Sequence, residues 1–82
     1  MNIGYFGGKV TEVGKFKFIY GDDLTHKAMI DIWVTLSDDR LVRFRGYDDM
    51  ADKILRNEFE FVYITGKVRT DGFVEITDIE KV

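Results

Sequence analysis

The clearest pattern in the chain is an alternation of hydrophobic and polar residues from Lys27 to Leu36, with the period of two that is typical of a half-buried β-strand. One face collects aliphatic side chains that we expect to enter a core: Ile30, Ile32, Val34 and Leu36. The opposite face carries Asp31, Trp33 and Thr35. The pattern therefore places the single tryptophan of the chain on the outer side of a strand.

A second alternating segment runs from Arg40 to Tyr47, and the turn-forming residues 37–39 separate it from the first. Its inward positions are Val42 and Phe44, and its outward positions are Arg43 and Arg45. We therefore expect the two segments to form a hairpin whose outer face combines Trp33 with both arginines.

The N-terminal segment from Ile3 to Tyr20 is rich in β-branched and aromatic residues, which predicts one long strand. It contains glycines at which such a strand can bulge or bend: Gly7, Gly8 and Gly14. Lys15 and Lys17 alternate with phenylalanines in this segment, so we expect both lysines to point outward. Residues 21–26 predict a loop.

The second half of the chain predicts a short helix and another hairpin. Asp48 or Asp49 can cap the helix, which ends near residues 56–57 because apolar residues follow helical spacing up to that point. Two strands follow, over residues 59–69 and 73–79, with a hairpin turn between them.

The strand over residues 59–69 is apolar on both faces, so alternation alone leaves open which face is buried. Val62, Ile64 and Val68 share one face, and Phe61, Tyr63 and Thr65 share the other. The 82 residues provide one modest core. We therefore predict a single all-β domain over residues 1–82, built as a five-stranded barrel with one short helix between its third and fourth strands.

Three segments carry a family resemblance: residues 46–55, with an aromatic residue before the helix, and the strand sequences ITGKVR at 64–69 and VEITDI at 74–79. With the element order, they resemble the OB-fold domains of the replication-protein-A and tRNA-anticodon-binding type. The resemblance implies an OB-type Greek-key barrel with a ligand groove over the outer face of strands two and three. The resemblance implies that the ligand is single-stranded DNA or RNA, with DNA preferred. It also implies that the protein is an accessory factor in DNA replication or recombination.

The implied groove would be lined by aromatic and basic side chains. Trp33 is the expected stacking platform, since a base stacked on an aromatic ring contributes about 1–3 kcal/mol. The basic residues expected to follow the phosphate backbone are Lys15, Lys17, Lys27, Arg43 and Arg45. Further candidate stacking residues on the last two strands are Phe61, Tyr63 and Phe73.

These residues also have structural interpretations. The arginines can pair with Asp31 across the hairpin, the lysines can protect an edge strand, and the aromatic residues of the last two strands can pack a subunit interface. The net charge of −3, from 12 basic and 15 acidic residues, opposes nucleic-acid binding by the molecule as a whole. The alternative function is therefore a subunit for protein interaction or assembly, including a homo-oligomer. Oligosaccharide binding would use the same tryptophan.

The composition also restricts chemistry and location. The chain has no cysteine, which excludes disulfides and favours a cytoplasmic location, and no apolar run approaches the roughly 18 residues of a membrane span. We interpret His26 as a loop residue, because with Asp22 and Asp23 it lacks the spacing of a zinc or calcium site. The aspartate pairs at 38–39 and 48–49 suit turn and cap roles. We therefore expect no catalytic residue, metal, cofactor or membrane partner.

Overall fold

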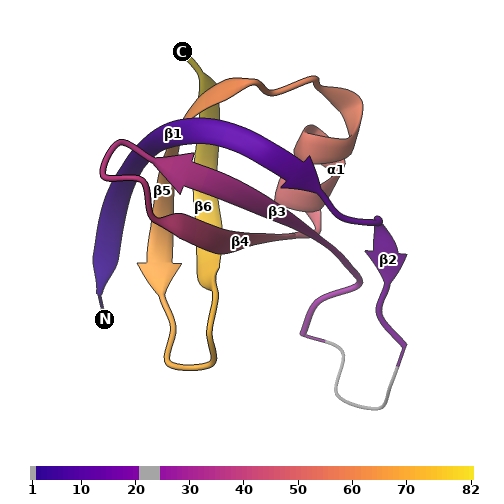
Figure 1. The fold of residues 1–82 in the computed structure, drawn as a ribbon. Helices are drawn as coiled ribbons and strands as arrows, with labels where there is room; N and C mark the ends of the chain where they lie inside the picture. Colours follow the sequence, from indigo (N-terminus) through magenta and orange to yellow (C-terminus); the bar gives the residue numbers. More distant parts are fainter. Residues whose placement is uncertain (1, 21–24) are drawn as a thin grey trace.

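The computed structural model describes residues 2–20 and 25–82. In chain order its elements are β1 (Ile3–Val13), β2 (Lys17–Phe18), β3 (Ala28–Leu36), β4 (Leu41–Tyr47), α1 (Asp49–Arg56), β5 (Phe61–Val68) and β6 (Val74–Lys81). The short strand β2 pairs with the start of β3. The five longer strands build the body of the molecule, and the predicted loop over residues 21–26 falls largely outside the described residues (Figure 1).

The five longer strands form a closed barrel. Their order is β1-β5-β6-β4-β3, and the ring closes because β1 also pairs with β3. β1 is antiparallel to both of its neighbours, whereas β4 and β6 run parallel. Figure 1 shows β1 curving across the front of the barrel, with α1 beyond one end of it. This connectivity is that of an OB-type Greek-key barrel, so the predicted fold class is confirmed.

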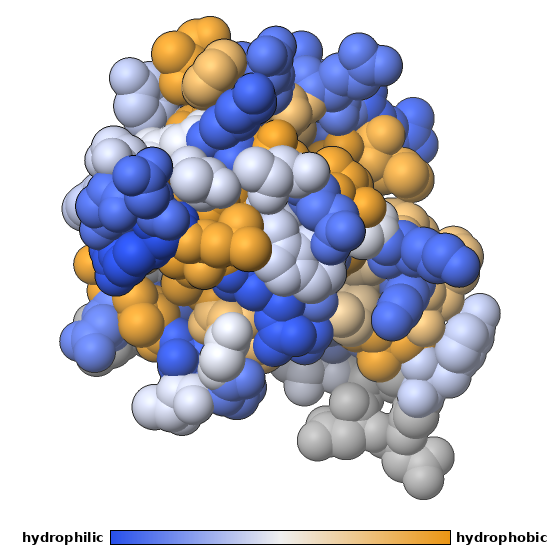
Figure 2. Space-filling model, in the orientation of Figure 1, coloured by the Kyte–Doolittle hydropathy of each residue, from blue (hydrophilic) through white to orange (hydrophobic). Residues whose placement is uncertain are grey.

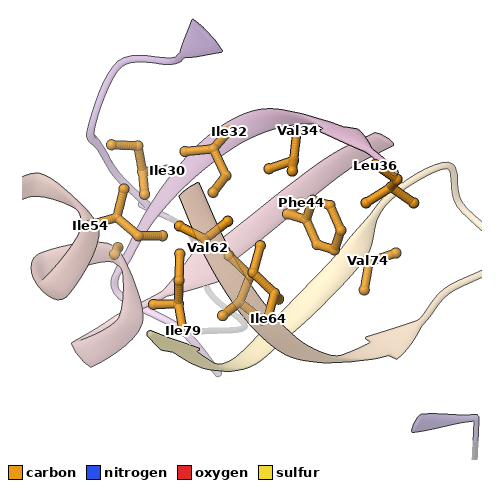
Figure 3. Packing of buried hydrophobic residues seen from close by; sticks show 12 residues of the cluster. Ile30, Ile32, Val34, Leu36, Phe44, Ile54, Val62, Ile64, Val74 and Ile79 are labelled. Carbon is orange, nitrogen blue, oxygen red and sulfur yellow. The ribbon is translucent and has the colours of Figure 1, made fainter. Parts of the chain in front are cut away.

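Alternating positions of the strands fill the barrel, as the sequence pattern predicts. Phe44 is fully buried, and its ring packs edge-to-face against Phe6 with 5.2 Å between the ring centroids. Figure 3 shows the side chains that converge on the barrel axis. The cluster consists of Ile30, Ile32, Val34, Leu36, Phe44, Ala51, Ile54, Val62, Ile64, Val74, Ile76 and Ile79. Each large member contributes about 1.5–3 kcal/mol through burial, so the register that hides these residues is strongly preferred.

The N-terminal strand is shorter than predicted. β1 ends at Val13, and pairing resumes in β2 at Lys17 instead of continuing without a break to Tyr20. The backbone amide of Gly14 donates a 2.7 Å hydrogen bond to the carbonyl oxygen of Asp31, and a Cβ at Gly14 would lie 3.0 Å from the same oxygen. This close approach of two backbones, which needs a glycine, is where the chain leaves β1.

Helix α1 packs on β3, β4 and β6 and buries Ala51 and Ile54. Asp48 occupies the N-cap position, as predicted, and its carbonyl oxygen accepts a hydrogen bond from the amide of Asp52, but its side chain makes no hydrogen bond to the helix. Asp48 has a φ of 51° and a ψ of −112°, a combination that glycine adopts more readily than other residues. Its Oδ1 instead accepts hydrogen bonds from the backbone amides of Lys27 at 2.7 Å and Ala28 at 3.1 Å. Asp48 therefore ties the start of the helix to the start of β3.

Candidate nucleic-acid interface

The outer face of the β3–β4 hairpin holds the predicted tryptophan and arginines in register. Trp33 lies directly opposite Arg43, and Asp31 lies directly opposite Arg45. Trp33 is half-buried, and its ring lies 3.4 Å from the position that a Cβ of Gly14 would take. Because Gly14 has no side chain, the indole rests against the connection between β1 and β2 and remains partly open to solvent.

Beside this row, Phe73 lies beneath three arginines. The guanidinium carbons of Arg45, Arg43 and Arg69 lie 4.3, 5.7 and 5.9 Å from the centroid of the Phe73 ring. Cation–π contacts at such distances contribute about 0.5–1 kcal/mol each at exposed sites. The Phe73 side chain is only 6% exposed. The ring of Phe73 is therefore too buried for a base to stack on it. Instead, its contacts with the three guanidinium groups keep these arginines together on one surface.

The three arginines differ in their carboxylate partners. Arg45 makes hydrogen bonds of 2.7 and 3.1 Å to the two carboxylate oxygens of Asp31, and these side chains are 19% and 14% exposed. This pairing raises the pKa of Arg45 above its ordinary value, against the opposing effect of burial. Arg69 donates a 2.9 Å hydrogen bond to Glu75. The alternative interpretation of cross-strand pairing with Asp31 is thus confirmed for Arg45.

Arg43 is the arginine of this group for which the described residues provide no such partner. Within residues 2–20 and 25–82, no carboxylate lies within salt-bridge distance of its guanidinium group. Its Nε is buried and, among the described residues, has no hydrogen-bond acceptor. A guanidinium group with unused donors beside a partly open indole can bind an anion and an aromatic ring at adjacent positions.

A small hollow of about 160 Å³ lies next to Trp33, at the point where the chain passes from β1 to β2. Its lining residues include Lys15, Lys17, Asp31 and Trp33. Both lysines are exposed, as the alternation predicts, and Lys27 is exposed just before β3 begins. The fold therefore brings predicted basic residues from three segments to one side of the barrel.

His26 is more constrained than a plain loop residue. Its ring stacks on Tyr47, with 4.0 Å between the centroids and 11° between the planes, and its Nδ1 lies 3.0 Å from a carboxylate oxygen of Asp48. The amide of Lys27, and then the His26 imidazole, lower the pKa of Asp48 below its ordinary value. These contacts hold the end of the loop next to the candidate interface. The two aspartates considered with His26 at positions 22–23 lie outside the described residues.

Two of the predicted stacking residues lie elsewhere. Phe61 and Tyr63 belong to β5, which pairs with β1 and β6 and not with the β3–β4 hairpin. Both rings are exposed on the outer face of β1 and β5. Conversely, Arg69 belongs to the arginine cluster but was missed, although its place beside the turn between the last two strands, which flanks an OB groove, could have indicated it.

Among the residues that the structure describes, no group of three or more histidine or acidic side chains is arranged to hold a metal ion. No helix among the described residues has the length and apolar character needed to cross a membrane. Comparison with protein-family models, with curated proteins and with solved structures finds no match to this chain.

Proposed function

We propose that the protein binds single-stranded nucleic acid, with DNA as the first ligand to test, through the outer face of the β3–β4 hairpin. The observation that carries this proposal is the pairing of Trp33 with Arg43, whose guanidinium group has no carboxylate partner among the described residues. One base stacks on the indole, which contributes about 1–3 kcal/mol, and an adjacent phosphate accepts hydrogen bonds from Arg43. The lysines beside β2 and β3 follow the backbone on either side.

The local charge is closer to balance than the net charge of −3 of the whole chain. Among the described residues of the face and its flanking segments, six are basic, Lys15, Lys17, Lys27, Arg43, Arg45 and Arg69, and five are acidic, Glu12, Asp31, Asp48, Asp71 and Glu75. The sequence between Lys17 and Lys27 adds Asp22 and Asp23. The proposal therefore rests on Trp33 and Arg43 and not on a general excess of positive charge, and it predicts modest affinity that decreases as salt screens the phosphates.

The experiment is a titration of the intrinsic fluorescence of Trp33 with oligo-dT and oligo-U at low and moderate salt. Saturable quenching that weakens with salt is expected, and Arg43→Gln should weaken binding and reduce the salt slope by about 0.7, the value for one phosphate contact on a single strand. Arg56→Gln is the matched control, because it removes one positive charge from α1, where Arg56 pairs with Asp52. Equal losses in the two variants, or no quenching at all, would refute the proposal.

A second candidate function, the protein-assembly subunit, is favoured by a separate observation. The exposed rings of Phe61 and Tyr63 lie away from the β3–β4 face, on the surface of β1 and β5. Exposed aromatic groups on a small β-protein are typical of association surfaces. Since the two surfaces are separate, the two functions do not exclude each other.

A further inference from the structure

A ridge of exposed aromatic side chains runs along the outer face of β1 and β5. Tyr5, Tyr63 and Phe61 are 82%, 59% and 50% exposed. The antiparallel register places Tyr63 opposite Gly7 and Phe61 opposite Lys9, so the two β5 rings are neighbours on one face. Nothing in the barrel core requires these rings, because the opposite face of β5 already supplies the buried residues.

A groove lies beside the ridge. Gly7 and Gly8 of β1 line it between Tyr63 and Phe61 on one side and Thr35, Leu36, Ser37 and Asp39 on the other. Its volume is about 600 Å³. Gly7 matters here, because a Cβ at this position would lie 3.4 Å from the Tyr63 ring and would fill part of the groove. Ridge and groove therefore run side by side along neighbouring strands.

We propose that two copies of this chain form a symmetric dimer through this face, with the ridge of each copy seated in the groove of the other. A two-fold axis parallel to the strands, placed between β1 and β5, sets β5 of one copy over β1 of its partner. Because this operation keeps the position along the strands, it puts Tyr63 of one copy above Gly7 of the other and Phe61 above Lys9. The two-fold axis generates this contact twice, once in each direction, as an isologous interface requires. Because the ridge and the groove of one chain complement each other in this way, a second copy of the chain is the partner that fits this face.

The charges at the borders of this face agree with the same symmetry. Lys9 is exposed on the β1 side, its Nζ lies 5.8 Å from the centroid of the Phe61 ring, and among the described residues it has no carboxylate within salt-bridge distance. On the other side, Glu80 and Asp78 of β6 lie opposite Tyr63 and Thr65 of β5, and both acids are exposed. Asp78 is already paired with Lys53 at 3.6 Å, so Glu80 carries most of the charge of this acidic border. Because the axis exchanges the two sides, Lys9 of each copy faces the acidic border of the other. Nucleic acid fits less well, since this acidic border would repel phosphate.

The available area predicts a weak dimer. With their exposed fractions, and about 150–250 Å² for each ring, the three aromatic side chains provide roughly 300–450 Å². A standard interface buries about 800 Å² per partner, so the groove walls and the borders must supply the rest. Figure 2 shows, from the side crossed by β1, apolar patches separated by charged groups and not one continuous apolar surface. We therefore expect a dissociation constant in the range of about 10–100 µM.

The test is sedimentation velocity of the full chain from about 1 to 200 µM, without nucleic acid, so that it stands apart from the function proposed above. A reversible monomer–dimer equilibrium is expected, and Tyr63→Glu should weaken it at least about tenfold, because it buries a charge at the centre of the contact. Tyr20→Glu is the matched control, since Tyr20 is 87% exposed and lies outside this face. A protein that stays monomeric throughout, or two variants with equal effects, would overturn the inference.

A charge exchange keeps the test valid if Tyr63→Glu does not fold, as judged by circular dichroism. Lys9→Glu should weaken the dimer through repulsion from the acidic border, and adding Glu80→Lys should restore it toward the affinity of the parent chain. Both positions are exposed, so folding should be preserved. A double variant that dimerises no better than Lys9→Glu alone would contradict the proposed orientation of the two copies.

Discussion

Removal of Asp31 should strengthen nucleic-acid binding, because this carboxylate now occupies one of the arginines on the β3–β4 face. In Asp31→Ala, Arg45 loses two hydrogen bonds but keeps its contact with the Phe73 ring, whose centroid lies 4.3 Å away. The guanidinium group therefore stays on the face and becomes available to a phosphate. One new hydrogen bond to a phosphate contributes about 0.5–1.5 kcal/mol, which corresponds to roughly two- to thirteenfold tighter binding at low salt.

The salt dependence gives a sharper measure of the same change. One additional phosphate contact makes the slope of log K against log salt more negative by about 0.7 on a single strand, so affinity should fall roughly 2.6-fold more between 50 and 200 mM salt. Asp31→Ala leaves a poorly exposed arginine without its carboxylate, which costs about 1–3 kcal/mol of folding free energy. A domain of 82 residues has about 4–12 kcal/mol in total, so the variant should fold.

The assay is fluorescence titration with oligo-dT over that salt range, beside the matched variant Asp52→Ala. Asp52 pairs with Arg56 on α1 at 2.8 Å, so this control also removes one negative charge and frees one arginine, but away from the β3–β4 face. We expect tighter binding and a steeper slope for Asp31→Ala alone. The same gain in both variants would mean that net charge, and not the face, governs binding.

Two further predictions concern the barrel itself. In Gly8→Ala the new Cβ would lie 2.3 Å from the carbonyl oxygen of Thr35, so thermal unfolding should show a decrease of about 1–3 kcal/mol in the free energy of unfolding. Gly7→Ala is the control, because its Cβ would have its nearest contact at 3.4 Å and the decrease should be smaller. A larger decrease for Gly7→Ala would refute the packing described. The pKa of Asp48 is lower in the folded protein than in the unfolded chain, chiefly because its carboxylate accepts a hydrogen bond from the amide of Lys27. Ionised Asp48 therefore stabilises the fold at pH values above its unfolded pKa of about 3.9, and this stabilisation is lost as the pH falls through the folded pKa. Asp48→Asn, followed by urea unfolding from pH 7 to 2, should therefore flatten the loss of stability on the acid side, and an unchanged pH profile would contradict this role.

The strand pattern of the chain was predictable because burial enforces a period of two. Ile32 and Val34 had to be inside once they shared a face, which placed Trp33 outside, and the structure confirms this register. Val68 shows the limit of the same argument. It continues the inward phase of β5 but is exposed, because it lies at the end of the strand.

The details that the sequence did not predict depend on contacts between distant residues. Phe73 sits at a strand start, where alternation gives no preference, and its burial comes from arginines on β4 and before β6. Asp48 satisfies the rule for a helix cap, yet the amides at the start of β3 compete for its carboxylate and bind it. The burial of Phe73 and the hydrogen-bond partners of Asp48 both depend on residues that are distant in the sequence, so a local sequence pattern could not predict them.

The parallel contact between β4 and β6 is the shortest junction of the closed ring, and it lies beneath the candidate interface. It consists of the pairs Phe44 with Val74 and Arg45 with Glu75, whereas β1 pairs along much of its length with both neighbours. Local opening of the native barrel should therefore begin there, and hydrogen exchange at this junction should be faster than at the other junctions of the five-stranded ring. Arg45 stands on β4, and Arg69 lies in the connection that leads into β6, so a phosphate backbone bound by both arginines would hold the two strands together. Ligand binding would then slow the opening of the barrel as well as occupy its surface.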